Sequence, residues 1–245
     1  MAQPTWRGLL FWGTVTFLWG MLPAYAVLPT EGGIRLNQTR VIFSASDKAQ
    51  TVTITNSDNR TYLVQSRVQF DTNNPAPAPF FITPPMFLLK PDSRQLLRIV
   101  HQGGALPTDR ESVFYLSVLA IPSRATKDDA PVQISAGLQF LIKLFYRPPA
   151  LSAASQTTLC PLHFSRQGLT VRVQNPTPYH QTLGRLAFDQ AEVNLQTQPS
   201  MLAPMSALTF AVSGAPLHAE WQTISDYGGL SAPCKQQIAT TQEVP

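Results

Sequence analysis

Short segments in which apolar and polar residues alternate occur along most of the chain. Thr51–Thr55 and Tyr62–Phe70 both alternate, and the turn-forming cluster Asn56–Asn59 lies between them. Alternation with a period of two sends successive side chains to opposite faces of a β-strand. The pattern therefore predicts these two strands and eight more, at Ile34–Leu36, Val41–Phe43, Leu96–Val100, Val113–Ile121, Val132–Tyr146, Leu169–Val173, Gln181–Phe188 and Leu208–Val212.

Proline supports strands over helices. The 22 prolines are spread over all 245 residues, and proline breaks the interior of a helix because it lacks an N–H and clashes with the preceding turn. Charged residues are only 13% of the chain, about half the usual ~25%. No convincing amphipathic helix lies between the strands, so a parallel α/β sheet is excluded. We expect an all-β protein built from antiparallel, immunoglobulin-like sandwiches.

The sequence Arg147-Pro148-Pro149-Ala150 interrupts the chain near its middle, and a second set of strands follows it. Each part has a length suited to one sandwich. We therefore expect two immunoglobulin-like β-sandwich domains, at residues 27–148 and 149–245.

Residues 1–26 have the features of a signal peptide. Arg7 precedes the apolar run Gly8–Leu22, and Ala24-Tyr25-Ala26 forms an A-x-A cleavage pattern. A single membrane anchor is the alternative, but the run has about 15 residues where a spanning helix needs roughly 20. We expect cleavage, export to an oxidising compartment, and a mature chain that begins near Val27.

No catalytic motif stands out. The G-x-S-x-G, H-E-x-x-H, P-loop and G-x-G-x-x-G patterns are missing, and the four histidines are scattered without metal-ligand spacing. We therefore expect no enzyme, no metal and no cofactor. Residues 27–148 carry 13 Lys and Arg against 9 Asp and Glu, but without the basic stripe of a nucleic-acid binder. This excess suggests an anionic group on some other partner.

The only two cysteines, Cys160 and Cys234, both fall in the predicted second domain. A disulfide and two free buried thiols are both compatible with the sequence. An oxidising compartment favours the disulfide.

Val132–Tyr146 is the most unusual segment. At about 14 residues it exceeds the usual strand of roughly five or six. Such a strand is an aggregation hazard when it forms a free edge, and pairing with a strand of a partner would cover it. Its apolar face could equally belong to the chain's own core, since alternation alone does not distinguish the two.

Six segments of the sequence resemble the PapD-like periplasmic chaperones of pilus assembly, which belong to the chaperone–usher pathway. In chain order, the segments are Gln38-Thr39-Arg40-Val41-Ile42-Phe43, Thr83-Pro84-Pro85, Asp109-Arg110-Glu111-Ser112-Val113-Phe114-Tyr115, Ile142-Lys143-Leu144-Phe145-Tyr146-Arg147-Pro148, Asn175-Pro176-Thr177-Pro178-Tyr179 and Asp226-Tyr227-Gly228-Gly229. Each is weak alone, but together they span nearly the whole mature chain.

The resemblance implies two immunoglobulin-like domains in a boomerang arrangement. It implies that Arg40 and Lys143 hold the C-terminal carboxylate of a pilus subunit, an incomplete sandwich that lacks its last strand. The strand before Lys143 would be lent to that subunit, and its donated side chains would be Val132, Ile134, Ala136 and Leu138. Ala136 is smaller than the aliphatic residue expected at its position.

The resemblance also implies a charge network between the domains, formed by Glu111, Arg147 and Asp226. Ser225 stands before Asp226 where asparagine is expected. The short segment Ser123–Pro131 without a cysteine pair is similar to the short-loop branch of the family.

The implied role is a periplasmic chaperone that folds pilus subunits, prevents premature polymerisation and delivers them to an outer-membrane usher. No nucleic acid is expected as a partner, and self-association of the free protein is compatible with an exposed edge. A structural pilus component or a surface adhesin is the alternative, although residues 27–33 are too short and too polar for the donor extension of a structural subunit. The Thr83–Pro84 bond could be cis or trans.

Overall fold

The computed structural model describes residues 33–73, 76–123, 136–151 and 160–240. The predicted signal peptide at residues 1–26 and two predicted donor residues, Val132 and Ile134, lie outside these ranges. The described residues form strands and loops, and no helix among them is long and apolar enough to cross a membrane.

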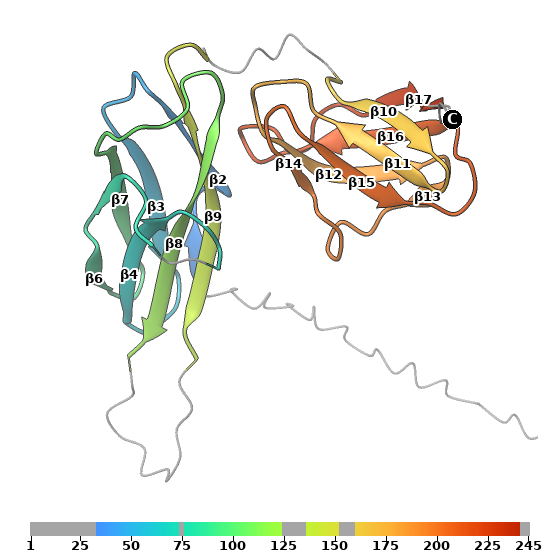
Figure 1. Cartoon of the computed structure of the whole chain (residues 1–245). Helices are drawn as coiled ribbons and strands as arrows, with labels where there is room; N and C mark the ends of the chain where they lie inside the picture. The colour runs from blue at the N-terminus through green and yellow to red at the C-terminus, as the bar shows by residue number, and fades with distance from the viewer. Residues whose placement is uncertain (1–32, 74–75, 124–135, 152–159, 241–245) are drawn as a thin grey trace, which may run out of the picture. The chain divides into compact units, whose positions relative to one another are not determined.

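The first sandwich consists of two sheets (Figure 1). One has the strand order β1-β3-β7-β5, with β1 at Ile34–Leu36, β3 at Gln50–Asn56, β7 at Ser93–His101 and β5 at Phe80–Thr83. The other has the order β2-β9-β8-β4-β6, with β2 at Arg40–Ser44, β9 at Leu138–Arg147, β8 at Ser112–Pro122, β4 at Tyr62–Gln69 and β6 at Met86–Leu89.

The N-terminal segment of this sandwich contributes to both sheets. β1 pairs antiparallel with β3, whereas β2 pairs parallel with β9. Asn37 lies at the crossing, where its backbone N–H donates to Thr53 O and its side chain accepts from Thr53 N–H at 2.7 Å. The crossing brings Arg40 to the start of β2, where Lys143 is its neighbour on β9.

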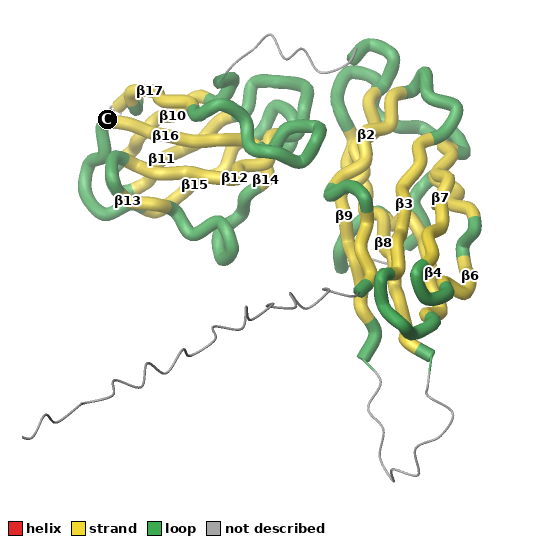
Figure 2. The backbone as a smooth tube through the Cα atoms, turned by 180° about the vertical axis from the view of Figure 1, so that it is seen from behind, coloured by secondary structure: helices red, strands yellow, loops and turns green. Residues whose placement is uncertain are grey.

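The second sandwich also has two sheets, and Figure 2 shows that strands and loops make up both sandwiches. One sheet has the order β15-β11-β10-β18, with β15 at Ala207–Ala211, β11 at Thr170–Gln174, β10 at His163–Gln167 and β18 at Ala239–Thr240. The other has the order β13-β12-β16-β17, with β13 at Ala191–Glu192, β12 at Gln181–Phe188, β16 at His218–Thr223, β17 at Cys234–Gln237, and β14 (Met201–Leu202) also paired with β12.

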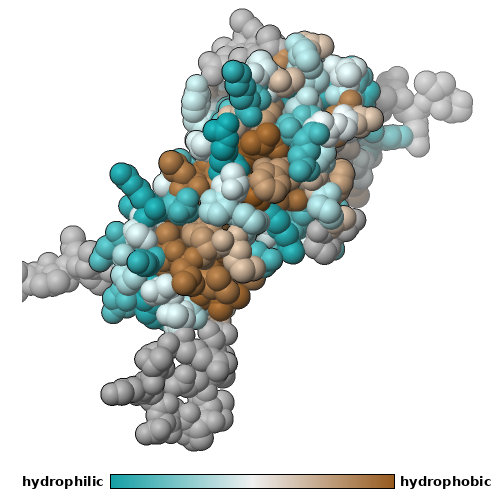
Figure 3. Space-filling view, turned by 90° about the vertical axis from the view of Figure 1, so that its left-hand side faces the viewer, coloured by the Kyte–Doolittle hydropathy of each residue, from teal (hydrophilic) through white to brown (hydrophobic). Residues whose placement is uncertain are grey.

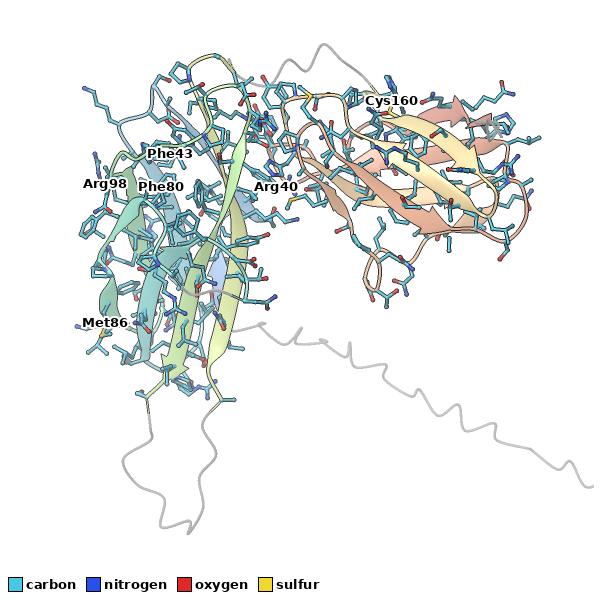
Figure 4. The ribbon with its side chains drawn as sticks, in the orientation of Figure 1. Arg40, Phe43, Phe80, Met86, Arg98 and Cys160 are labelled. Carbon is cyan, nitrogen blue, oxygen red and sulfur yellow. A yellow bond between two sulfur atoms is a disulfide. The ribbon has the colours of Figure 1, made fainter. Side chains whose placement is uncertain are left out.

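Each sandwich has its own apolar core. In the first, Phe43 and Phe80 meet edge to face with ring centroids 5.5 Å apart, and both are labelled in Figure 4. In the second, Trp221 packs on Phe164 with ring centroids 4.6 Å apart. Two separate cores bear out the expectation of two immunoglobulin-like sandwiches in an all-β chain.

A disulfide joins Cys160, just before β10, to Cys234 at the start of β17. The bond closes a loop of 74 residues in sequence separation. A loop of this length lowers the entropy of the unfolded chain enough to stabilise the fold by about 4 kcal/mol.

The strands predicted from alternation are present, but other strands were missed. Each predicted strand that lies within the described residues is present, but β5, β6, β10, β13, β14, β16, β17 and β18 were not predicted. β6 was missed because Met86–Leu89 is apolar at every position and shows no period. Two pairings, β2 with β9 and β10 with β18, are parallel instead of antiparallel.

The predicted long strand differs from the observed one at its N-terminal end. β9 begins at Leu138, and Ala136 and Gly137 precede it as described residues without strand pairing. The Thr83–Pro84 peptide, which the sequence left open, is cis.

Exposed apolar side chains gather on the outer face of the sheet that contains β4, β6 and β8. Leu63 on β4 is paired with Leu88 on β6 and with Ile121 on β8, and all three are exposed. Figure 3 shows an apolar patch on this side of the molecule. Patches of this kind often mark interaction surfaces.

Candidate functional site

Two cationic side chains lie next to each other on the first sandwich. Arg40 opens β2, and Lys143 is its direct partner in the parallel register with β9. Arg40 Nη1 donates to the backbone oxygen of Ile224, from the second sandwich, at 3.1 Å. The guanidinium carbon of Arg40 also lies 5.7 Å from the centre of the Phe145 ring. These contacts fix Arg40, which is labelled in Figure 4.

Neither cation has a carboxylate partner within ion-pair distance among the described residues. Both side chains are half-buried, and Arg40 Nε is buried without a hydrogen-bond acceptor. Burial lowers the pKa of Lys143, and the adjacent charge of Arg40 lowers it further. Burial also lowers the pKa of Arg40, although the charges of Asp226 and Glu111 act in the opposite direction.

Two adjacent, partly desolvated cations of like charge destabilise each other unless an anion joins them. A buried donor without an acceptor costs roughly 1–3 kcal/mol more. A bound carboxylate would offset the repulsion between the two cations, since it can accept from Arg40 and Lys143 at once. The arrangement is therefore suited to an anionic group supplied from outside the chain.

A second arginine links the two sandwiches. Arg147, at the end of β9, donates from both terminal nitrogens to Asp226 of the second sandwich, with both distances 2.7 Å. Its Nε donates to Glu111 at 2.9 Å. Burial opposes the charge on Arg147, but the hydrogen bonds and charges of Asp226 and Glu111 outweigh it and raise the pKa of Arg147.

Histidine 180 is a fourth member of this network. Its backbone N–H donates to Glu111 Oε2 at 2.8 Å, and its ring Nδ1 lies 3.0 Å from the same oxygen. The backbone N–H of Glu111 donates in return to Pro178 O at 2.9 Å. Glu111 and the turn Pro178–His180 thus hold each other across the two sandwiches.

The family resemblance grouped Glu111, Arg147 and Asp226 but did not include His180, which looked like one of four scattered histidines. The turn that presents His180 depends on Asn175. This fully buried asparagine donates to Tyr179 O at 2.7 Å and to Ala203 O at 2.9 Å. The signal for this turn in the sequence was the asparagine of Asn-Pro-Thr-Pro, because asparagine side chains shape turns by bonding to the backbone.

The strand before Lys143 has one open edge. β9 pairs with β8 from Ser112↔Tyr146 to Ala120↔Leu138, but β2 covers its other edge only from Lys143 to Arg147. The edge of Leu138–Ile142 therefore carries unpaired backbone groups within the described sheet. The expected free edge is therefore present along Leu138–Ile142, whereas β2 covers the edge along Lys143–Arg147.

One face of β9 leaves the core as it approaches this open edge. Leu144 and Tyr146 belong to the core, and Phe140 and Ile142 pack against it as partly buried residues. Leu138 is on the same face but 48% exposed. Ala136 is exposed as well. Of the predicted donor residues, these two are therefore available to a partner.

No group of three or more histidine, cysteine, aspartate or glutamate side chains that could hold a metal ion occurs in the part of the chain described. The site instead combines two adjacent cations with an open strand edge and an exposed apolar side chain.

Comparisons with known proteins agree with this geometry. Residues 33–152 match the family model for the pili and flagellar-assembly chaperone PapD N-terminal domain, and residues 159–235 match that for the pili assembly chaperone PapD C-terminal domain. The probable fimbrial chaperone LpfB of Escherichia coli O157:H7 is 35% identical over 204 residues, covering 82% of this chain and 86% of LpfB. The chaperone protein FimC of Escherichia coli K12 is 34% identical over 207 residues, covering 82% and 83%.

Solved structures give the same result. A chain in the structure of the Salmonella enterica SafA pilin in complex with the SafB chaperone matches with a TM-score of 0.76 at 29% identity. The match covers 84% of this chain and 97% of the matched chain. The Escherichia coli chaperone DraB matches with a TM-score of 0.75 at 30% identity, covering 84% and 98%. Both parts of the chain match PapD family models, and its sequence and fold match those of other pilus chaperones over most of its length. The chain therefore belongs to the PapD family of pilus assembly chaperones.

Proposed function

We propose that this protein is a periplasmic chaperone that captures a pilus subunit by its C-terminal carboxylate, completes the subunit's fold with β9, and delivers it to an outer-membrane usher. The observation that carries the proposal is the pair Arg40 and Lys143, adjacent in register and with no carboxylate of the described residues within ion-pair distance. The family is one of chaperones, and this site binds without doing chemistry. A structural pilus component would have no use for an anion site beside an open edge.

The carboxylate would accept hydrogen bonds from Lys143 Nζ and from the guanidinium of Arg40. Hydrogen bonds to charged groups contribute about 1.5–3 kcal/mol each. Because the site is partly buried, water competes for these donors less than it would at an exposed pair.

The open edge of β9 would bind the subunit by strand addition. Backbone groups of Leu138–Ile142 would pair with a subunit strand, and Leu138 and Ala136 would enter the subunit's apolar groove. By the same alternation, Ile134 and Val132 would follow. Strand addition fixes the register, since a slip of one residue would turn every donated side chain away from the groove.

The same proposal assigns a role to each part of the chain. Residues 1–26 would direct export and be cleaved, residues 27–148 would form the domain that holds the subunit, and residues 149–245 would form the second domain. The usher would receive the loaded chaperone. Folding of the subunit on the chaperone would supply the driving force, so no nucleotide or other cofactor is required.

The test is a pull-down of the tagged mature chain from the periplasm, co-expressed with candidate pilus subunits. Lys143→Ala should weaken capture by at least about tenfold, since removing one partner of a buried charge contact costs roughly 2–5 kcal/mol. Lys90→Ala is the matched control, because Lys90 is an exposed lysine of the same sandwich.

Capture equal to wild type by a folded Lys143→Ala variant would remove the carboxylate anchor from the proposal. Loss of capture by Lys90→Ala as well would show a general effect of charge. A wild-type chain that captures no subunit would contradict the chaperone role itself.

A further inference from the structure

The loop from Ile224 to Leu230 is a closed turn at the edge of the second sandwich. Ile224 and Leu230 form an isolated antiparallel bridge. Within the turn, Ser225 N–H donates to Gly229 O at 2.8 Å and Gly228 N–H donates to Ser225 O at 2.9 Å. These bonds hold the loop in one backbone conformation.

The first sandwich holds the same loop at three points. Arg40 donates to Ile224 O, and Arg147 binds both oxygens of Asp226. Gly228 lies against Thr39 so closely that a Cβ would collide with the threonine hydroxyl, and its φ of +85° favours glycine as well. The residues on both sides of Tyr227 are therefore fixed beside Arg40.

Tyr227 itself is 90% exposed, although its neighbours in sequence are held. An aromatic ring on a rigid loop loses little conformational entropy on binding, which is why tyrosine is common in binding surfaces. Leu230, at the base of the turn, is 57% exposed and extends the apolar surface. Neither side chain contributes to the core of the second sandwich.

We propose that Tyr227 is a specificity-determining contact for the C-terminal end of the pilus subunit, where it packs on an apolar or aromatic side chain within the last few residues. The inference rests on the proposed function, which places the subunit's carboxylate at Arg40. A chain end held there passes the loop that Arg40 bonds, and an extended chain advances about 3.3 Å per residue. The occupant is thus an apolar side chain close to the anchored carboxylate.

The experiment measures the affinity of synthetic peptides for the purified mature chain. One peptide carries the last fifteen or so residues of a subunit that the wild-type chain captures. A second has the apolar residue nearest its C-terminus replaced by serine, and a third ends in an amide in place of the carboxylate. The protein variants are Tyr227→Ala, Tyr227→Phe and the control Leu169→Ala, which removes another exposed apolar side chain elsewhere on the second sandwich.

Tyr227→Ala should bind the natural peptide roughly 3- to 10-fold more weakly, the range expected for loss of an aromatic contact. Tyr227→Phe and Leu169→Ala should bind it like wild type. The serine peptide should bind wild type and Tyr227→Ala equally, because the contact is then already absent. This coupling is a readout that a merely structural role of Tyr227 would not produce.

Equal affinity of wild type and Tyr227→Ala for the natural peptide would overturn the inference, as would the same loss for both peptides. The amide peptide separates this failure from failure of the proposed function. Weak binding of the amide with no effect of Tyr227→Ala rejects only the role of Tyr227. Equal binding of acid and amide, or no binding of the natural peptide, rejects the carboxylate anchor on which the inference rests.

Discussion

His101 packs beside the core of the first sandwich and makes the stability of that sandwich depend on pH. The residue ends β7, and its ring lies 4.7 Å from that of Tyr146 and 5.0 Å from that of Phe80. Its Nε2 atom is buried without a hydrogen-bond partner among the described residues. Burial lowers the pKa of His101, because the aromatic surroundings disfavour the charged imidazolium.

A folded-state pKa below the unfolded value means that the unfolded chain binds the proton more readily. The free energy of unfolding is therefore unaffected at high pH and falls as the pH drops below the unfolded pKa of about 6.5. We expect His101→Phe, which suits the aromatic cluster and cannot be protonated, to unfold at a higher temperature than wild type near pH 5. The two proteins should differ much less near pH 8.

Calorimetry of the purified chain at the two pH values measures this difference. His163→Phe is the control, since His163 is exposed at the start of β10. A difference between His101→Phe and wild type that is the same at both pH values would mean that ring packing, and not protonation, is responsible.

At the scale of the element, the apolar face of β9 changes along its length from core packing to exposure at the open edge. Phe140 packs against the core of the first sandwich, whereas Leu138, two residues earlier on the same face, is half exposed beside the open edge. The chain's own core thus ends between these two residues. A partner's groove would continue the same apolar row.

Leu138→Glu should therefore reduce subunit capture without unfolding the chaperone. Burying a leucine contributes about 1.5–3 kcal/mol, so its replacement by a charged side chain should weaken capture by at least about tenfold. The pull-down described above measures the complex, and circular dichroism reports the fold. Leu169→Glu places the same charge at an exposed leucine of the second sandwich and should capture normally.

Phe140→Ala provides the contrast, because it should lower the stability of the free chaperone through lost core packing. If Leu138→Glu captures subunits like wild type, the donated face has been assigned wrongly.

Elements with regular alternation were predictable from the sequence, and the relations between elements were not. β3, β4 and β8 follow directly from a period of two. The crossing of residues 34–44 from one sheet to the other could not be predicted, because it depends on Asn37 bonding to Thr53 and on parallel pairing with a strand some hundred residues later. Arg40 and Lys143 were identified as a pair only through resemblance, since nothing local in the sequence brings them together. His180 was missed for the same reason.

At the scale of the whole molecule, Arg147 does more than join the two sandwiches. It binds both oxygens of Asp226, whose negative charge also acts on Arg40. Because Asp226 is engaged and only 34% exposed, it does not fill the anion site beside Arg40 and Lys143. If Arg40 and Lys143 bind the subunit carboxylate as proposed, the network would keep their position free for it.

Arg147→Met should affect both stability and capture. The loss of the arginine leaves Glu111, which is 2% exposed, as a buried charge without its strongest partner. The free energy of unfolding should fall by about 3–5 kcal/mol, measured by urea denaturation. Lys235→Ala, which breaks an exposed ion pair with Glu220, should leave it unchanged.

Capture should also weaken, because a released Asp226 carboxylate can compete with the subunit for Arg40. Adding Asp226→Asn to Arg147→Met distinguishes competition from instability. The amide carries no charge, so the double variant should recover part of the subunit capture measured by pull-down, although it restores no ion pair between the sandwiches. Capture that stays equally low in the double variant would assign the whole effect to lost stability, and Arg147 would then be a structural link without a role in keeping the anion site open.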